Sequence, residues 1–174
     1  MSPPKRVPPH TPLVAIFLGS KSDRPELEGA VQVLTELGIA HRVLVASAHR
    51  SPERAAELAR SAEGSGLRVL IAAAGGAAHL AGVLAAHTNL PVIGVPLASS
   101  PLGGIDALYS TVQMPPGIPV ATMAVGPWGA SNAAILAAQI LALSDPALRR
   151  KLQRRKAALA EKVERDSRAI ESTN

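Results

Sequence analysis

The regular alternation of short apolar runs with helical patterns most constrains the fold of this chain. Five apolar runs end at glycine, proline or small polar residues, and each is followed by a stretch with apolar residues at helical spacing. This alternation predicts a parallel sheet with helices on both faces, because parallel neighbours need a crossover connection and a helix is the usual one. The expected strands are residues 13–18, 41–45, 69–74, 91–95 and 120–125.

The expected helices follow these strands, and a last one extends beyond the sheet. Hydrophobic residues make up 47% of the chain, yet only one Phe, one Tyr and one Trp are present, which is typical of an aliphatic core between a parallel sheet and helices. We therefore predict an α/β protein: a three-layer α/β/α sandwich with a flavodoxin-like, five-stranded parallel sheet and an extra C-terminal helix. The expected helices are residues 24–37, 52–62, 80–87, 105–112, 133–143 and 145–170.

A chain of 174 residues is long enough for one domain with a substantial core. We predict a single domain over residues 13–172, preceded by a disordered, proline-rich tail over residues 1–12. The tail has no long apolar stretch, so we expect neither a signal peptide nor membrane association. The absence of cysteine excludes disulfides, thiolate nucleophiles and Cys-containing zinc sites, and fits a cytoplasmic protein.

The net charge of +5 comes largely from the expected terminal helix. Two basic triplets, residues 149–151 and 154–156, alternate with Leu and Ala at helical spacing and have no aromatic residues for stacking on bases. A solvated helix face is the favoured interpretation, and no nucleic-acid partner is expected, although a basic nucleic-acid-binding oligomer stays as an alternative. The narrow apolar stripe of this helix favours packing against another subunit: Leu148, Leu152, Leu159 and Val163.

Four polar, glycine-rich loops follow the first four expected strands. Right-handed crossovers place the carboxyl ends of parallel strands at one edge of the sheet, which is where ligands bind in such folds. The sequence therefore predicts a ligand site there, built from residues 19–23, 47–50, 75–79 and 99–106.

The first of these loops reads Gly19-Ser20-Lys21-Ser22-Asp23. Its hydroxyls and amides at a helix N-terminus are suited to a phosphate, and its carboxylate to ribose hydroxyls. It lacks both the P-loop spacing and the dinucleotide fingerprint, which favours a monophosphate ligand over ATP or NAD. An ordinary capped turn is the alternative, because Ser and Asp are also common N-cap residues.

The second loop holds His49 and Arg50, a group that titrates near neutrality beside a permanent cation. Proton transfer next to an anion needs these two residue types together. Ser51 is expected as the N-cap of the next helix, with Pro52 as its first residue. The alternatives are a surface histidine that caps this helix and an exposed ion pair from Arg50 to Glu53, which would contribute little.

The third loop, Gly75-Gly76-Ala77-Ala78-His79, has minimal side chains. Small residues let backbone amides approach a carboxylate or carbon dioxide closely. We expect His79 itself to act mainly as a helix cap. The remaining histidines, His10, His41 and His87, have no partner pattern, and no histidines and carboxylates have metal-ligand spacing, so no metal is expected.

Five segments together resemble the class I N5-carboxyaminoimidazole ribonucleotide mutases, the PurE family of bacterial purine biosynthesis: residues 19–23, 47–52, 75–80, 90–96 and 112–115. The resemblance implies an isomerase that moves a carboxylate from the exocyclic nitrogen of its imidazole ribonucleotide to carbon 4 of the ring. It implies no metal, ATP or organic cofactor, and a homo-octamer. Ala81 departs from the proline that many members have after the His-Leu of the third loop.

The resemblance also implies roles for individual residues. His49 is the expected general acid and base, and Ser20, Asp23 and Arg50 are expected to bind the ribose phosphate. Two alternatives remain, a carboxylase that adds free carbon dioxide to aminoimidazole ribonucleotide and a flavodoxin-like nucleotide-binding module. The scarcity of aromatic residues argues against a flavin site. The rest of the expected substrate-binding set is Ser22, Ser47, Ala48, Gly75, Gly76, Ala77, Ala78, His79 and Leu80.

Overall fold

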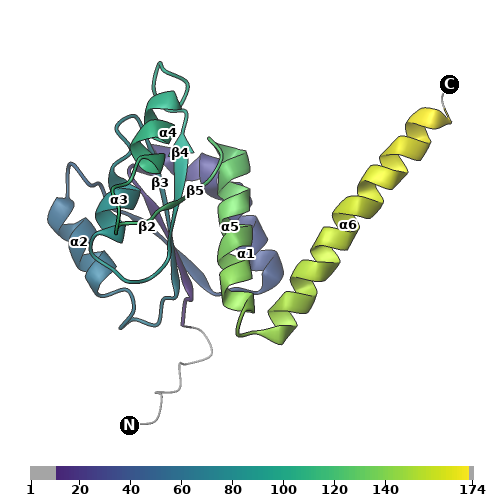
Figure 1. Ribbon diagram of the computed structural model, residues 1–174, viewed down its shortest axis with the longest axis horizontal. Helices are drawn as coiled ribbons and strands as arrows, with labels where there is room; N and C mark the ends of the chain where they lie inside the picture. Colours follow the sequence, from purple (N-terminus) through teal and green to yellow (C-terminus); the bar gives the residue numbers. More distant parts are fainter. Residues whose placement is uncertain (1–10, 173–174) are drawn as a thin grey trace, which may run out of the picture.

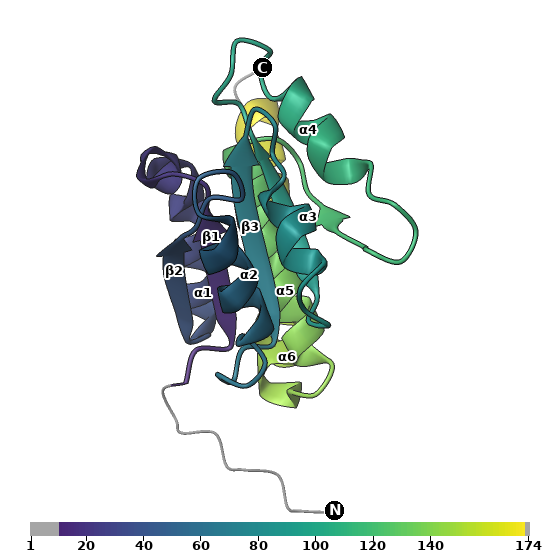
Figure 2. The same cartoon turned by 90° about the vertical axis from the view of Figure 1, so that its left-hand side faces the viewer.

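The computed structural model describes residues 11–172. Its sheet has five parallel strands in the order β2-β1-β3-β4-β5, with helices on both faces (Figures 1 and 2), which confirms the predicted sandwich. The predicted tail falls almost entirely in residues 1–10, outside the described part. The strands are β1 (Val14–Leu18), β2 (His41–Val45), β3 (Val69–Gly75), β4 (Val92–Leu97) and β5 (Ala121–Thr122).

Two groups of helices cover the sheet. On one face lie α1 (Glu28–Leu37) and α5 (Pro127–Ala142), which pack closely on each other. The other face carries α2 (Pro52–Arg60), α3 (Leu80–Ala85) and α4 (Ile105–Val112). The C-terminal helix α6 (Pro146–Glu171) belongs to neither layer (Figure 1).

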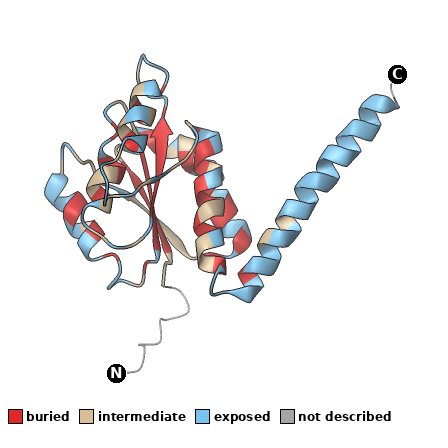
Figure 3. Ribbon diagram, in the orientation of Figure 1, coloured by how far each residue is buried: buried red, intermediate tan, exposed pale blue. Residues whose placement is uncertain are grey.

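The core consists of two apolar layers separated by the sheet (Figure 3). Every residue of β1 is buried, and its side chains alternate between the layers: Ile16 packs with α1 and α5, whereas Phe17 packs with α2 and α3. This burial on both faces is why the strands read as continuous apolar runs rather than as alternating ones. Small residues let α5 lie close to the sheet and to α1: Gly129, Ala130, Ala133, Ala134, Ala137 and Ala138.

Three elements differ from the sequence prediction by more than two residues at one end. The helix expected from residue 24 begins instead as a 3-10 helix, η1 (Lys21–Leu27), with Pro25 inside it, and becomes α-helical only at Glu28. Helix α5 begins at Pro127 rather than Ala133, because a proline fits the first turn of a helix, where its missing N–H is not needed. The last strand is shorter than expected, since only Ala121 and Thr122 pair with β4 at the sheet edge.

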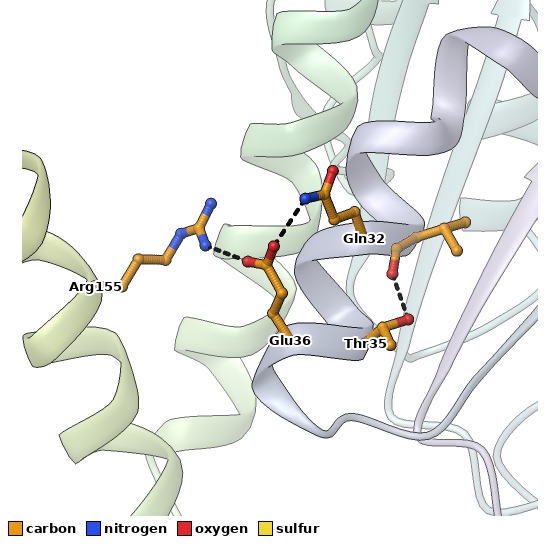
Figure 4. Close-up of polar contacts among 5 residues, drawn as sticks. Gln32, Thr35, Glu36 and Arg155 are labelled. Carbon is orange, nitrogen blue, oxygen red and sulfur yellow. Dashed lines mark hydrogen bonds and ion pairs between the residues drawn. The ribbon is translucent and has the colours of Figure 1, made fainter.

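Helix α6 projects away from the sandwich, and most of its surface is exposed (Figures 1 and 3). Only its base is attached: Leu148 is buried, Lys151 Nζ donates a hydrogen bond to Leu37 O at 2.6 Å, and Arg155 Nη1 lies 2.7 Å from Glu36 Oε2 (Figure 4). Gln32 donates to the other oxygen of the same carboxylate, and both contacts hold the pKa of Glu36 below its usual value. Within residues 11–172, no helix is both long enough and apolar enough to span a membrane.

Candidate active site

A cavity of about 470 Å³ lies where the first four strands end, as the parallel topology predicts. The chain passes from β1 outward to β2 and then returns to the other side of β1 to form β3, so the strand order reverses at this point. Loops from four strands, some far apart in sequence, therefore meet around one hollow. The residues that line it are Gly19, Ser20, Ser22, Asp23, Ser47, Ala48, His49, Arg50, Ala74, Gly75, Ala77, His79, Leu80 and Ser99.

The loop after β1 is both a capped turn and a polar wall of this cavity. Ser20 N–H donates to Asp23 Oδ2 at 3.0 Å, and Ser22 N–H donates to Ser20 Oγ at 3.3 Å. Asp23 is 8% exposed, and this burial raises the pKa of its carboxyl, an effect that the Ser20 amide and the Arg50 charge partly offset. A partly desolvated carboxylate is thus held beside a cluster of hydroxyls.

Arg50 is fixed by contacts with the neighbouring loops. Its Nη2 donates to Gly19 O at 2.9 Å, while its backbone N–H donates to Ser47 Oγ at 3.1 Å. No ion pair joins Arg50 to Glu53 among the described residues, so the alternative of an exposed pair is wrong. The guanidinium is left beside the cavity, where it attracts anions.

Ser51 occupies the predicted N-cap position before Pro52, but its hydroxyl does not cap α2. It closes the His49 loop instead, accepting a hydrogen bond from Ser47 N–H at 3.0 Å and donating to Ser47 O at 3.2 Å. The Ser51 side chain therefore holds together the two ends of the loop that carries His49.

His49 and His79 meet across the cavity although they are 30 residues apart. His49 Nε2 lies 2.8 Å from His79 Nδ1, and the rings are edge to face, with centroids 4.8 Å apart and an angle of 76° between their planes. His79 stands at the N-cap of α3 but makes no capping hydrogen bond, so the expectation that it caps the helix is wrong. The two imidazoles form one hydrogen-bonded pair.

The glycine-rich loop after β3 brings backbone close to this pair. Gly76 has a φ of 62°, in the left-handed region that favours glycine, and sets the turn after the strand. Gly76 and Ala78 are the predicted site residues that do not line the cavity, and Ala78 is only 2% exposed. They shape the loop, whereas Gly75 and Ala77 line the cavity.

The other described histidines lie outside this cavity. His41 Nδ1 is 2.9 Å from Ile39 O, and His87 Nδ1 is 3.4 Å from Arg60 Nη1. No group of three or more histidines and carboxylates within residues 11–172 is placed to hold a metal ion. His10 lies outside the described residues.

A larger hollow, of about 780 Å³, lies at the opposite edge of the sheet, next to the start of β4. Its polar groups are few and include Arg60 and His87, whereas much of its lining is Pro, Ala, Val, Leu and Ile. The smaller cavity is the better candidate, because it gathers hydroxyls, a carboxylate, a guanidinium and two imidazoles at the carboxyl ends of the strands.

Three lining residues were not among those individually predicted to bind substrate, although Gly19 and Ser99 belong to loops predicted to build the site: Gly19, Ala74 and Ser99. The sequence predicted that the loop beginning at Ser99 lies at this edge, but it predicted no residue of that loop to bind the substrate. The register between β3 and β4 explains why Ser99 reaches the cavity. Gly75 pairs with Leu97 in the β3 and β4 ladder, so Ser99 comes only two residues past the end of that register.

A doubly wound parallel sheet with a histidine pair, an arginine and a glycine-rich loop at its switch point defines an α/β protein whose candidate site is suited to a small anionic ligand. The chain belongs to the AIR carboxylase family, whose model matches residues 13–162. This finding confirms the resemblance seen in the sequence.

Three relatives named N5-carboxyaminoimidazole ribonucleotide mutase match most of the chain. The Haemophilus influenzae protein is 54% identical over 82% of this chain and 87% of its own length. The Pyrococcus horikoshii protein is 49% identical over 92% of this chain and 89% of its own length. The Escherichia coli K12 protein is 54% identical over 80% of this chain and 82% of its own length.

A solved structure has the same fold. Treponema denticola PurE superposes with a TM-score of 0.80 and 29% identity, covering 89% of this chain and 96% of that one. The match includes nearly the whole of the other chain, so the comparison supports the family membership as well as the three-layer architecture.

Proposed function

We propose that this protein converts N5-carboxyaminoimidazole ribonucleotide into 4-carboxy-5-aminoimidazole ribonucleotide, a step of de novo purine biosynthesis. Relatives at 49% to 54% identity over at least four fifths of the chain carry the name of this mutase. The observation that carries the proposal is the placement of His49, Arg50 and Gly75 around one cavity at the switch point of the sheet.

The ribose phosphate end of the substrate binds beside β1 and β2. Arg50 and the hydroxyls of Ser20, Ser22 and Ser47 supply a cation and hydrogen-bond donors for the phosphate. Asp23 accepts hydrogen bonds from ribose hydroxyls. Its oxygen is already aligned by the Ser20 amide, so little rearrangement is needed.

His49 carries the proton between the two halves of the reaction. The bond between the exocyclic nitrogen and the carboxylate carbon breaks, its electron pair stays on the nitrogen, and protonated His49 gives its proton to that nitrogen. The products of this half are aminoimidazole ribonucleotide and carbon dioxide. The electron pair of ring carbon 4 then forms a bond to carbon dioxide, and neutral His49 takes the carbon 4 proton, which restores the starting protonation state.

The glycine-rich loop holds the carboxylate while this happens. Backbone N–H groups at Gly75 and Ala77 stabilise its negative charge, and the apolar side chains of Ala48, Ala77 and Leu80 exclude water from the transient carbon dioxide. Gly76, Ala78 and His79 support this loop and the His49 ring. This route requires no metal, ATP or organic cofactor.

The direct test offers the purified protein each of two substrates. A mutase converts N5-carboxyaminoimidazole ribonucleotide without added bicarbonate, and aminoimidazole ribonucleotide plus bicarbonate gives little product at low bicarbonate. The reverse preference would establish the alternative, a carboxylase using free carbon dioxide, which the description of the family model keeps open. Failure to convert either substrate would contradict both.

We further propose that the protein is a cytoplasmic homo-octamer. Large apolar side chains remain exposed on the single chain, including Trp128 at 84% and Tyr109 at 63%, and the outer half of α6 adds Leu159 and Val163. Such surfaces favour burial against further copies of the chain. Light scattering coupled to size exclusion would give the mass of the assembly, and a monomer at micromolar concentration would contradict the proposal.

A further inference from the structure

Ser99 lies at the end of the cavity farthest from the phosphate-binding loops. It follows β4, whereas Arg50 follows β2, and the strands β1 and β3 lie between these two. The Ser99 Oγ occupies the space that a side chain on Gly75 would need, because a Cβ atom on Gly75 would overlap it. A hydroxyl therefore stands directly against the glycine-rich loop.

This hydroxyl is free for a ligand. Ser99 is exposed, lines the cavity, and has no hydrogen-bond partner among the described residues. The hydroxyl of its neighbour Ser100 has a partner within the loop: Ser100 Oγ accepts from Leu102 N–H at 3.2 Å, and the Ser100 side chain lowers the pKa of the Asp106 carboxyl. Of these two adjacent serines, Ser100 stabilises the loop and Ser99 faces the cavity.

We infer that the Ser99 hydroxyl donates a hydrogen bond to the carboxylate that is transferred, and that it holds this group in the carboxylated states of the reaction. The inference rests on the proposed mutase function. The ribose and the carboxylate lie on different sides of the imidazole ring, whether the carboxylate is on the exocyclic nitrogen or on carbon 4. When Arg50 and Ser20 hold the phosphate beside β1 and β2, the carboxylate extends toward β3 and β4, where Gly75 and Ser99 lie.

The pairing with Gly75 gives the contact its selectivity. Because the Ser99 hydroxyl lies directly against Gly75, the amides of the glycine-rich loop and this hydroxyl can bind different oxygens of one carboxylate. Aminoimidazole ribonucleotide has no carboxylate for the Ser99 hydroxyl to bond. Ser99 therefore discriminates between carboxylated and decarboxylated nucleotides rather than adding affinity for both.

The experiment measures binding of both nucleotides by calorimetry in a His49→Asn background, which prevents turnover. The ligands are 4-carboxy-5-aminoimidazole ribonucleotide and 5-aminoimidazole ribonucleotide. We expect Ser99→Ala to weaken binding of the carboxylated nucleotide by about tenfold, as for loss of a hydrogen bond to a charged group, and to leave the other affinity unchanged. Ser100→Ala is the matched control and is expected to leave the ratio of the two dissociation constants unchanged.

Two outcomes separate this inference from the function beneath it. If the His49→Asn protein binds neither nucleotide, the proposed function is contradicted. If it binds both, but Ser99→Ala leaves the ratio of dissociation constants unchanged or weakens both nucleotides equally, only the role of Ser99 is overturned.

Discussion

His49 Nε2 lies 2.8 Å from His79 Nδ1, so the two rings share one hydrogen bond. Two neutral imidazoles can make this bond only when one of the facing nitrogens carries a proton and the other does not. The tautomers of the rings are therefore linked, and a proton that His49 gives or takes changes the hydrogen bond with His79. The pair thus joins two loops of the cavity that follow different strands.

Replacing His49 by Asn tests the proton-transfer role. Asn retains a polar group of similar reach but does not exchange protons near neutral pH. We expect kcat to fall by about 10² to 10⁴-fold, the usual contribution of general acid and base catalysis, with nucleotide affinity largely retained. Steady-state kinetics and calorimetry check the two parts, and near-normal kcat would exclude His49 as the proton carrier.

Replacing His79 separates positioning from mere packing. In His79→Asn the amide still offers a hydrogen-bonding atom near the place of Nδ1, whereas His79→Phe keeps a ring of similar size and removes the bond. We expect Phe to change the pH profile of kcat and to lower kcat by up to about tenfold, and Asn to do neither. Identical profiles for both variants would show that the hydrogen bond between the rings does not matter for turnover.

Arg50→Ala removes the cation that faces the cavity from the loop after β2. We expect KM to rise by about 10- to 100-fold, because charge-assisted hydrogen bonds to phosphate are lost, with a smaller effect on kcat. Arg54→Ala is the matched control: Arg54 Nε donates to Val45 O at 3.4 Å, and Arg54 does not line the cavity. Equal KM values for the two variants would argue against a phosphate role for Arg50.

The sequence was sufficient to predict the layers and most of the residues that line the candidate cavity, because both follow from local patterns. Apolar runs and the loops after them place Ser20, His49 and Gly75 at one edge without knowledge of strand order. Contacts between distant loops could not be predicted in this way. The His79 ring was expected to cap α3, but its partner His49 is on another loop, and Ser99 reaches the site only through the register of β3 and β4.

Asp23→Asn tests how much the burial of an ionised carboxylate lowers the free energy of unfolding. Burial raises the pKa of Asp23 above its ordinary value of 3.8. At pH values between 3.8 and this raised pKa, the folded state therefore binds more protons than the unfolded chain. The unfolding free energy therefore falls as pH rises through this interval, and the carboxylate remains a cost at neutral pH. Asn does not ionise and can still accept from Ser20 N–H.

The measurement for this variant is chemical denaturation at several pH values. We expect the stability of wild type relative to Asp23→Asn to decrease from below pH 3.8 toward neutral pH and then to become constant. A difference that does not change with pH, or that grows in favour of wild type as pH rises, would contradict the raised pKa.

Lys151 fixes the base of α6 to the end of α1, and its replacement tests that attachment. Lys151 Nζ donates to Leu37 O at 2.6 Å, beside the left-handed Gly38 that ends α1. Lys151→Met keeps an unbranched side chain but removes the donor, so we expect the unfolding free energy to fall by about 1 kcal/mol. Arg150→Met removes the same charge one residue earlier and is expected to change stability by less than about 0.5 kcal/mol. Urea denaturation compares them, and equal losses would mean that net charge, rather than this hydrogen bond, holds the helix.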